Sequence, residues 1–300
     1  MSDEEYQQWL QDQTEVATGT APEVKPEDVT WAEQNIEEGE HVFNILLIGQ
    51  DRREGQGRQR SDAMILCTVN TKTKTLTMTS FMRDLYVQIP GYYSNKMNAC
   101  YQIGGRALLD SCLETNFGVT VDGNVEVDFG GFMDVVDMMG GVDIELNEVE
   151  ANYLNRRGNW DVDNSTAGTW HLQAGMNHLT GEQALAYSRI RHVGNGDFER
   201  TERQRKVLTA MVEQSRNLSI SQLNGLLQAA LPLLTTDMSN QDIIGYAAKV
   251  FTILPELKIN TQRVPADDTW EYAIISGLDV VRMFDVEANV DMLRITMEHE

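Results

Sequence analysis

Two continuous apolar runs constrain the fold of this chain more than any other feature of its sequence. Residues 43–49 (FNILLIG) and 63–69 (AMILCTV) lack the apolar–polar alternation of a half-exposed strand. Such runs are typical of strands buried on both faces, where helices cover both sides of a sheet. Helical periodicity appears later in the chain, so the pattern predicts a layered α/β fold.

Further segments carry strand or helix patterns. Residues 75–81 alternate, and the run 85–89 ends at Pro90-Gly91, as strands do. No stretch of linker composition interrupts residues 41–300, which we therefore expect to form one domain. The remaining expected strands are 142–147 and 259–265, and the expected helices are 98–116, 129–139, 180–191, 199–217, 220–233, 239–253 and 286–298.

The negative charge is unevenly spread. The 300 residues carry a formal net charge of −22. Residues 1–40 hold twelve acidic residues and one basic residue. The other 260 residues hold 34 acidic and 23 basic residues, so each part has a net charge of −11. We expect residues 1–40 to be an acidic tail or stalk. The acidic balance argues against a nucleic-acid partner, because a polyphosphate backbone attracts basic surfaces.

Several common signatures are missing from the sequence. No run of 18 or more apolar residues predicts a membrane-spanning helix, and the start MSDEEYQQWL does not have the form of a signal peptide. The sequence contains no phosphate-loop, GxGxxG, GxSxG or HExxH motif. Three cysteines without a CxxC motif indicate no zinc site, and the spacing leaves open whether Cys100 and Cys112 pair.

A pair of aspartates follows and begins the two buried runs. Asp51 stands just after the first run, and Asp62 stands at the start of the second. If the two strands are antiparallel neighbours, the end of one meets the start of the other. Two carboxylates there suit Mg²⁺, which prefers a few carboxylates together with phosphate oxygens. The alternative is that both aspartates cap turns and pair with arginines.

A single arginine, Arg83, follows the expected strand 75–81. It would lie at the same edge of the sheet as Asp51, and its guanidinium group matches phosphate oxygens in a bidentate way.

Ten of the 23 basic residues beyond residue 40 lie in two short windows, 51–60 and 189–206. In the second window, Arg189 and Arg191 end one expected helix, and a glycine-rich turn leads to the next helix. Arg200, Arg203 and Gln204 share one face of that next helix, because their spacing is i, i+3, i+4.

This second window has two interpretations. Free backbone N–H groups at a helix start favour a bound anion. Alternatively, the arginines pair with Glu199 and Glu202 on a solvated helix surface. Arginines at a helix N-terminus oppose the helix dipole, which favours the anion site.

Seven segments together match a known family in order. They are NILLIGQDRR at 44–53, RSDAMIL at 60–66, SFMRDLYVQIP at 80–90, KMNACYQIGG at 96–105, VDMMGGVDIEL at 136–146, HLTGEQALAYSRIRH at 178–192 and GDFERTERQ at 196–204. On these motifs the chain resembles the LytR-CpsA-Psr proteins of Gram-positive bacteria, over roughly residues 43–217 and more loosely to residue 300.

The resemblance implies a single three-layer α/β/α domain with a central mixed sheet and an apolar pocket for a lipid tail. It implies a phosphotransferase that attaches a cell-wall glycopolymer, such as teichoic acid or capsular polysaccharide, from a polyprenyl-pyrophosphate carrier to peptidoglycan through a phosphodiester bond. Mg²⁺ is the implied cofactor. Met133, Met138 and Met139 are candidates for the pocket lining, or ordinary core residues.

The resemblance also assigns roles to residues. The implied metal ligands are Asp51 and Asp62, which are also catalytic candidates together with Arg83. The implied supporting groups are Asp197 and Arg52. The implied phosphate-binding residues are Arg60, Arg83, Arg189, Arg191, Arg200, Arg203 and Gln204.

Other functions fit the same residues. One is a non-catalytic protein that binds polyprenyl pyrophosphate, and another is a lipid pyrophosphatase in which water replaces the sugar acceptor. For the transferase, the expected location is the outer face of the cell membrane of a Gram-positive bacterium. The chain would then be a soluble ectodomain whose N-terminal membrane anchor is absent from this sequence.

Overall fold

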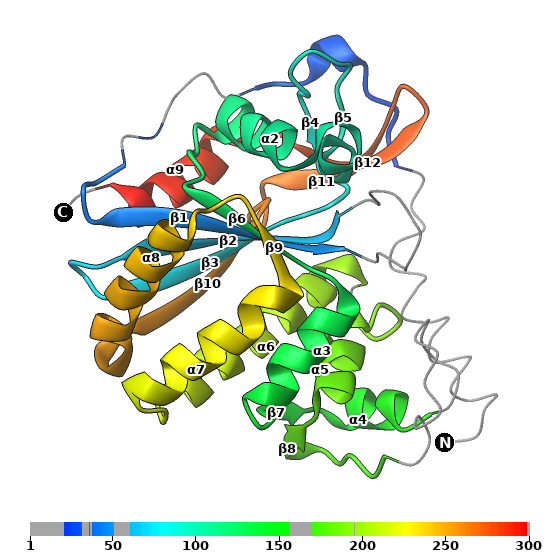
Figure 1. Cartoon of the computed structure of the whole chain (residues 1–300). Coiled ribbons are helices and arrows are strands. Elements are labelled where there is room, and N and C mark those ends of the chain that lie inside the picture. The colour runs from blue at the N-terminus through cyan, green and yellow to red at the C-terminus, as the bar shows by residue number, and fades with distance from the viewer. Residues whose placement is uncertain are drawn as a thin grey trace. The chain divides into compact units, whose positions relative to one another are not determined.

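The computed structural model describes residues 21–31, 36, 38–50, 61–156, 170–194 and 196–298. These residues group into two compact units, one formed by Gly130–Leu233 and the other by Ala21–Phe129 with Leu234–Glu300 (Figure 1). The boundary at residue 41 and the single domain over 41–300 remain predictions. No helix within the described ranges is long and apolar enough to cross a membrane.

The unit formed by Ala21–Phe129 with Leu234–Glu300 contains a six-stranded mixed sheet in the order β10-β3-β2-β1-β6-β9. β1 pairs with β2 in antiparallel and with β6 in parallel orientation, and β3 lies antiparallel to β2. β10 runs parallel to β3, and β9 antiparallel to β6. The strands are β1 (Val42–Gln50), β2 (Ser61–Asn70), β3 (Thr75–Phe81), β6 (Gly123–Val127), β9 (Leu234–Thr236) and β10 (Lys258–Val264).

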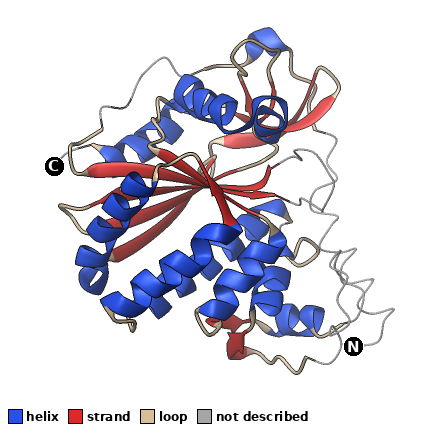
Figure 2. Cartoon of the chain, viewed as in Figure 1, coloured by secondary structure: helices blue, strands red, loops and turns tan. Residues whose placement is uncertain are grey.

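Helices cover both faces of this sheet. Figure 1 shows α2 (Met97–Phe117) and α9 (Val286–Met297) on one face and α8 (Asn240–Ile253) on the other. Leu46 and Ile48 in β1 are fully buried. Phe43 stacks on Tyr246 of α8, with ring centroids 4.6 Å apart. The predicted three-layer α/β/α arrangement around a mixed sheet is therefore confirmed (Figure 2).

Smaller elements complete this unit. β4 and β5 form one two-stranded sheet, and β11 and β12 form another. Part of the predicted tail contacts the second of these, because the amide of Val24 donates to the carbonyl of Ile274. Trp31 stacks on Tyr86, with ring centroids 6.0 Å apart. The bounds are η2 (Pro26–Asp28), β4 (Tyr86–Val87), β5 (Asn95–Lys96), η4 (Leu254–Glu256), β11 (Trp270–Ile275) and β12 (Leu278–Met283).

The other unit is mainly helical, with a two-stranded sheet of β7 and β8. β7 alternates, so Val142, Ile144 and Leu146 are buried while Asp143 and Glu145 are exposed. The elements are α3 (Phe129–Met138), β7 (Val142–Leu146), α4 (Glu148–Leu154), β8 (Gly175–Leu179), α5 (Gly181–Arg189), α6 (Asp197–Ser215), α7 (Ile220–Ala230) and η3 (Leu231–Leu233).

Two predicted elements differ from the structure. The strand expected at 85–89 is only Tyr86–Val87 long, and the chain then turns at Pro90-Gly91. The helix expected at 98–116 is kinked at Gly105, whose φ of 69° is outside the helical region and is readily adopted only by glycine. Cys100 and Cys112 in this helix are both buried and are free cysteines.

A matched pair of substitutions tests the core position of β1. Ile48 is fully buried, whereas Ile295 in α9 is 81% exposed. We expect Ile48→Ala to lower the free energy of unfolding by about 2–5 kcal/mol, because it removes buried methyl groups and leaves a cavity. Ile295→Ala should change it by less than about 0.5 kcal/mol. Urea denaturation checks both values, and equal losses would contradict the described packing.

Candidate functional site

Three strand ends meet at one edge of the six-stranded sheet. Because β1 and β3 both run antiparallel to β2, their C-terminal ends lie where β2 begins. Gln50 at the end of β1 pairs with Ser61 at the start of β2. The antiparallel neighbours that the aspartate hypothesis required are therefore present.

Asp62 and Arg83 are in contact at this edge. Arg83 Nη1 donates to Asp62 Oδ1 over 3.0 Å, and the side chains are 27% and 23% exposed for Asp62 and Arg83, respectively. Arg83 Nε also lies 3.4 Å from Asp84 Oδ2, and Lys96 Nζ lies 2.8 Å from Asp84 Oδ1. The sequence did not indicate Asp84 or Lys96 as site residues. The contacts hold the Arg83 guanidinium group between two carboxylates at the surface.

The other predicted residues near this edge, Asp51, Arg52 and Arg60, lie outside the described residues. Within the described ranges, no group of three or more histidine, cysteine, aspartate or glutamate side chains has the arrangement of a metal site. Of the two predicted metal ligands, only Asp62 is among the described residues. The metal site thus stays a prediction.

A buried polar network lies on the same sheet, between β6 and α2. Gln50 donates to Glu126 over 3.3 Å, and Arg106 Nε lies 3.5 Å from the same carboxylate. Asn124 donates to both Asp110 and Asp237 over 2.9 Å. Burial raises the pKa of Asp110 to about 6, and the nearby Asp237 charge adds to that effect. The network fixes Gln50, the last residue of β1.

The second predicted group lies in the helical unit, around the junction of α5 and α6. Arg189 is the last residue of α5, and Arg191 is exposed in the following turn. Gly196 precedes α6 with a φ of 63°. Arg200 in the first turns of α6 is only 2% exposed, and its Nη2 donates to Asp197 Oδ2 over 2.9 Å.

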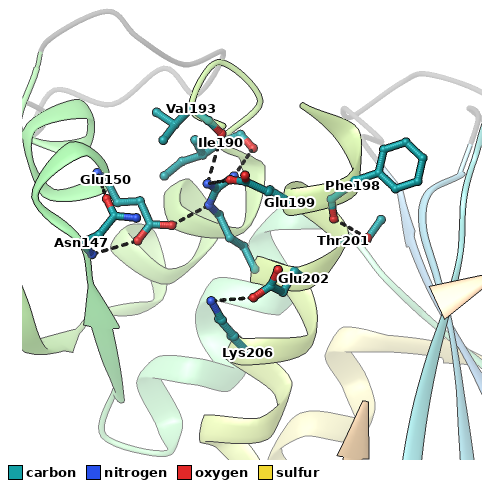
Figure 3. A network of polar contacts seen from close by, with 10 residues as sticks. Asn147, Glu150, Ile190, Val193, Phe198, Glu199, Thr201, Glu202 and Lys206 are labelled. Atoms are coloured by element: carbon teal, nitrogen blue, oxygen red, sulfur yellow. Dashed lines mark hydrogen bonds and ion pairs between the residues drawn. The ribbon is translucent and has the colours of Figure 1, made fainter. Parts of the chain in front are cut away.

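Arg203 has partners that come from several elements, and Figure 3 labels four of them, Glu150, Glu199, Ile190 and Val193. Its Nε donates to Glu150 Oε1 over 2.8 Å, and its Nη2 donates to Glu199 Oε2 over 2.7 Å. Its Nη1 and Nη2 also donate to the carbonyls of Ile190 and Val193, over 3.2 and 3.1 Å. Arg203 thus pairs with Glu199, as the second interpretation expected, but it also pairs with Glu150 and is buried, so it does not lie on a solvated helix surface.

The remaining residues named in this window also lie on α6. Gln204 is half-buried in α6. Glu202 pairs with Lys206 over 2.8 Å on the exposed side of the helix. Glu150 was not indicated as a site residue, although the sequence Asn147-Glu148-Val149-Glu150 has the spacing of a capping box, which the structure contains.

A cavity of about 350 Å³ lies elsewhere, beside the start of β1 and lined by His41, Phe43 and Lys249 among others. It is at the opposite end of β1 from Gln50. The predicted lipid pocket remains a prediction.

The fold resembles solved bacterial structures. The crystal structure of B. subtilis TagT matches with a TM-score of 0.68 and 27% sequence identity, covering 92% of this chain and 99% of that chain. TagT bound to LIIa-WTA matches with a TM-score of 0.69 and 27% sequence identity, covering 91% of this chain and 98% of that chain. A protein from Streptococcus agalactiae, gbs0355, has a TM-score of 0.71 at 24% identity, with 88% and 92% covered, and shares the fold.

Sequence comparison gives the family. The model of the LytR_cpsA_psr family matches residues 6–289, and the chain belongs to this family, as its motifs predicted.

Curated relatives of this chain are described as polyisoprenyl-teichoic acid–peptidoglycan teichoic acid transferases. TagT of Bacillus subtilis (strain 168) is 34% identical over 230 residues, covering 75% of this chain and 68% of the relative. TagU of Bacillus mycoides (strain KBAB4) is 36% identical over 178 residues, covering 59% and 53%. TagV of Bacillus subtilis (strain 168) is 30% identical over 263 residues, covering 85% and 64%. The chain thus spans about half to two thirds of the length of these relatives.

A histidine in the helical unit provides a pH test of the structure. His178 on β8 has one ring nitrogen 2.7 Å from Asp143 Oδ1 and the other 2.7 Å from the carbonyl of Gly140. Both partners are acceptors, so the doubly protonated ring is favoured, and the bond to Asp143 is the main cause of the raised pKa of His178.

The raised pKa means that His178 stabilises the fold fully below its ordinary pKa of 6.5, and that this contribution is lost as pH rises through the folded-state value. The side chain is 58% exposed, so solvent screening limits the effect to no more than about 1 kcal/mol. We expect the stability difference between the wild type and His178→Gln to shrink as the pH rises above about 6.5. Urea denaturation at several pH values measures it, and a pH-independent difference would contradict this bonding.

Proposed function

We propose that this chain is a phosphotransferase that moves a glycopolymer from a polyprenyl-pyrophosphate carrier to peptidoglycan and forms a phosphodiester bond. Two separate ion pairs carry the proposal. Arg83 is held by Asp62, and the buried Arg200 is held by Asp197. Membership of the LytR_cpsA_psr family and the similarity to teichoic acid transferases support the same reaction.

The chemistry needs positioning and charge neutralisation more than covalent participation by the protein. Arg83 is held in place before substrate arrives, because Asp62 and Asp84 both contact it. Fixed donors of this kind stabilise the charge that develops on phosphate oxygens without reorganising during the reaction. Arg189, Arg191 and Arg200 are the proposed phosphate-binding residues of the helical unit.

We extend the proposal to Mg²⁺, with Asp51 and Asp62 as ligands. Asp62 fits this role in its chemistry, since it is a partly exposed carboxylate beside a phosphate-binding candidate. When bound, the cation supplies charge neutralisation at the pyrophosphate and lowers the pKa of an attacking hydroxyl group. Asp51 and Asp62 are also the candidates to accept the proton of that hydroxyl group.

The lipid part of the carrier requires apolar contacts. Ile45 and Leu47 lie on one face of β1 and are only half-buried, unlike Leu46 and Ile48 on the other face. Ile45 and Leu47 are the proposed contacts for a prenyl tail. The proposed location is the outer face of the cell membrane of a Gram-positive bacterium, where such a carrier meets peptidoglycan.

The arginines provide the first functional test. We expect Arg83→Ala to lower kcat/KM for transfer from a lipid-linked saccharide to a peptidoglycan oligomer by about 100-fold, the effect typical of removing one charge-stabilising donor. Adding Arg200→Ala should leave no measurable transfer. Product formation by the purified protein, followed by mass spectrometry, is the measurement.

The matched control is the Arg216→Ala/Arg294→Ala double variant, since both arginines pair with exposed carboxylates, Arg216 directly after α6 and Arg294 on α9. Full transfer by the Arg83→Ala/Arg200→Ala variant would overturn the proposal. Binding of the carrier without any product would indicate a binding protein, and phosphate release without an acceptor would indicate a pyrophosphatase.

Metal removal provides a second functional test. We expect EDTA to abolish transfer and added Mg²⁺ to restore it, because the proposed cation neutralises the pyrophosphate. Asp62→Asn should need a higher Mg²⁺ concentration for half-maximal activity, since an amide is a weaker ligand than a carboxylate. Undiminished transfer in EDTA would contradict the metal assignment while leaving the arginine test intact.

A further inference from the structure

The Glu150–Arg203 contact joins two elements that are distant in sequence. Glu150 is on α4 and Arg203 is on α6, and they are 5% and 2% exposed. The bond between Glu150 Oε1 and Arg203 Nε is 2.8 Å long. A buried ion pair of this kind has a large desolvation cost, so it is weak evidence for added stability. What the contact shows is that α4 and α6 are joined through the Arg203 guanidinium group.

Glu150 is itself held in place by the start of its own helix. Its Oε2 accepts from the amide of Asn147 over 3.0 Å, and the Asn147 side chain accepts from the amide of Glu150 over 2.8 Å. The orientation of the carboxylate is therefore set by α4 before it meets Arg203. Figure 3 shows Asn147 and Glu150 on one side of this network and Glu199 on the other.

Arg203 in turn holds the segment that follows α5. It donates to the carbonyls of Ile190 and Val193, which lie on either side of Arg191 and His192 in the chain. The segment is also closed at Gly194, which has a φ of 76°, where an added Cβ atom would clash with the Glu199 carboxylate. The backbone that carries Arg191 is thus fixed through Arg203.

The two carboxylates on Arg203 also argue that it does not itself bind the substrate. Glu150 and Glu199 lie within 2.8 Å of it, so its charge is already neutralised by the protein. Arg191, by contrast, is exposed. Arg203 therefore supports the backbone of the segment that carries the exposed Arg191.

We propose that Glu150 is a positioning residue, which acts through Arg203 to hold the Ile190–Val193 segment so that Arg191 meets the phosphate groups of the carrier. This inference rests on the proposed function. It assigns a role in that function to a residue that does not contact the substrate.

The test compares Glu150→Gln with Glu202→Gln, which makes the same change at an exposed glutamate of the same helix as Arg203. We expect Glu150→Gln to weaken binding of inorganic pyrophosphate, measured by calorimetry, by about tenfold, because small displacements of a positioned group have effects of this size or larger. The amides of the Ile190–Val193 segment should exchange with deuterium faster. Glu202→Gln should leave both unchanged within about twofold.

Epistasis separates positioning from general stability. If Glu150 acts through Arg203, Glu150→Gln should add no further loss of affinity to an Arg203→Met variant. Independent, additive losses would overturn the proposal, as would unchanged pyrophosphate affinity in Glu150→Gln. If Glu150→Gln does not fold, Glu199→Gln removes the more exposed partner of Arg203 and should give a smaller loss in the same direction.

The outcomes are distinguishable from failure of the proposed function. A wild-type protein that transfers glycopolymer, with Glu150→Gln equal to it in transfer and in pyrophosphate affinity, would overturn only the positioning role. A wild-type protein that binds pyrophosphate without transfer, with weakened binding in Glu150→Gln, would overturn only the transferase. A wild-type protein that does neither would overturn both.

Discussion

The antiparallel pairing of β1 with β2 is the constraint on which the sheet and its functional edge depend. It runs from Val42 and Asn70 to Gly49 and Ala63, with a register shift between Gly49 and Gln50. At Gly49 the strands are so close that a Cβ atom would lie 3.2 Å from the Cβ of Ala63. β3 and β6 extend the sheet on either side, and the end of β3 then carries Arg83 to Asp62.

A fully buried asparagine connects this pairing to the start of the chain. Asn44 in β1 accepts from Thr68 of β2 over 2.7 Å and donates to Glu38 and to the carbonyl of Thr120. Burial raises the pKa of Glu38, against the opposing effect of its hydrogen bonds. A buried amide with all these partners fixes the register of β1, since a shift of one residue would leave it without them. Glu38 lies in the predicted tail, so at least this acidic residue has a structural role in the sheet.

Sequence patterns predicted the elements that are strongly apolar or strongly periodic. Both buried runs are strands, and the helices at 239–253 and 286–298 agree with α8 and α9 to within one residue at each end. β6 was missed because its sequence GNVEV is short and polar, and its burial depends on pairing with β1. The hairpin of β11 and β12 was missed for a related reason, because its apolar face packs against residues that are distant in sequence, such as Tyr86.

The candidate site shows the same limit at the level of single residues. Arg200 and Arg203 are three positions apart on one helix and are both buried, and the family resemblance implied phosphate binding for both. Their surroundings separate them, since Arg200 contacts Asp197 in its own first turn while Arg203 contacts Glu150, which is 53 positions away. Helical spacing reports which side chains share a face, but it does not report which carboxylate another element brings to that face. Internal ion pairing is therefore one physical origin of the arginine cluster, since both Arg200 and Arg203 take part in it. Anion binding by the cluster remains a proposal.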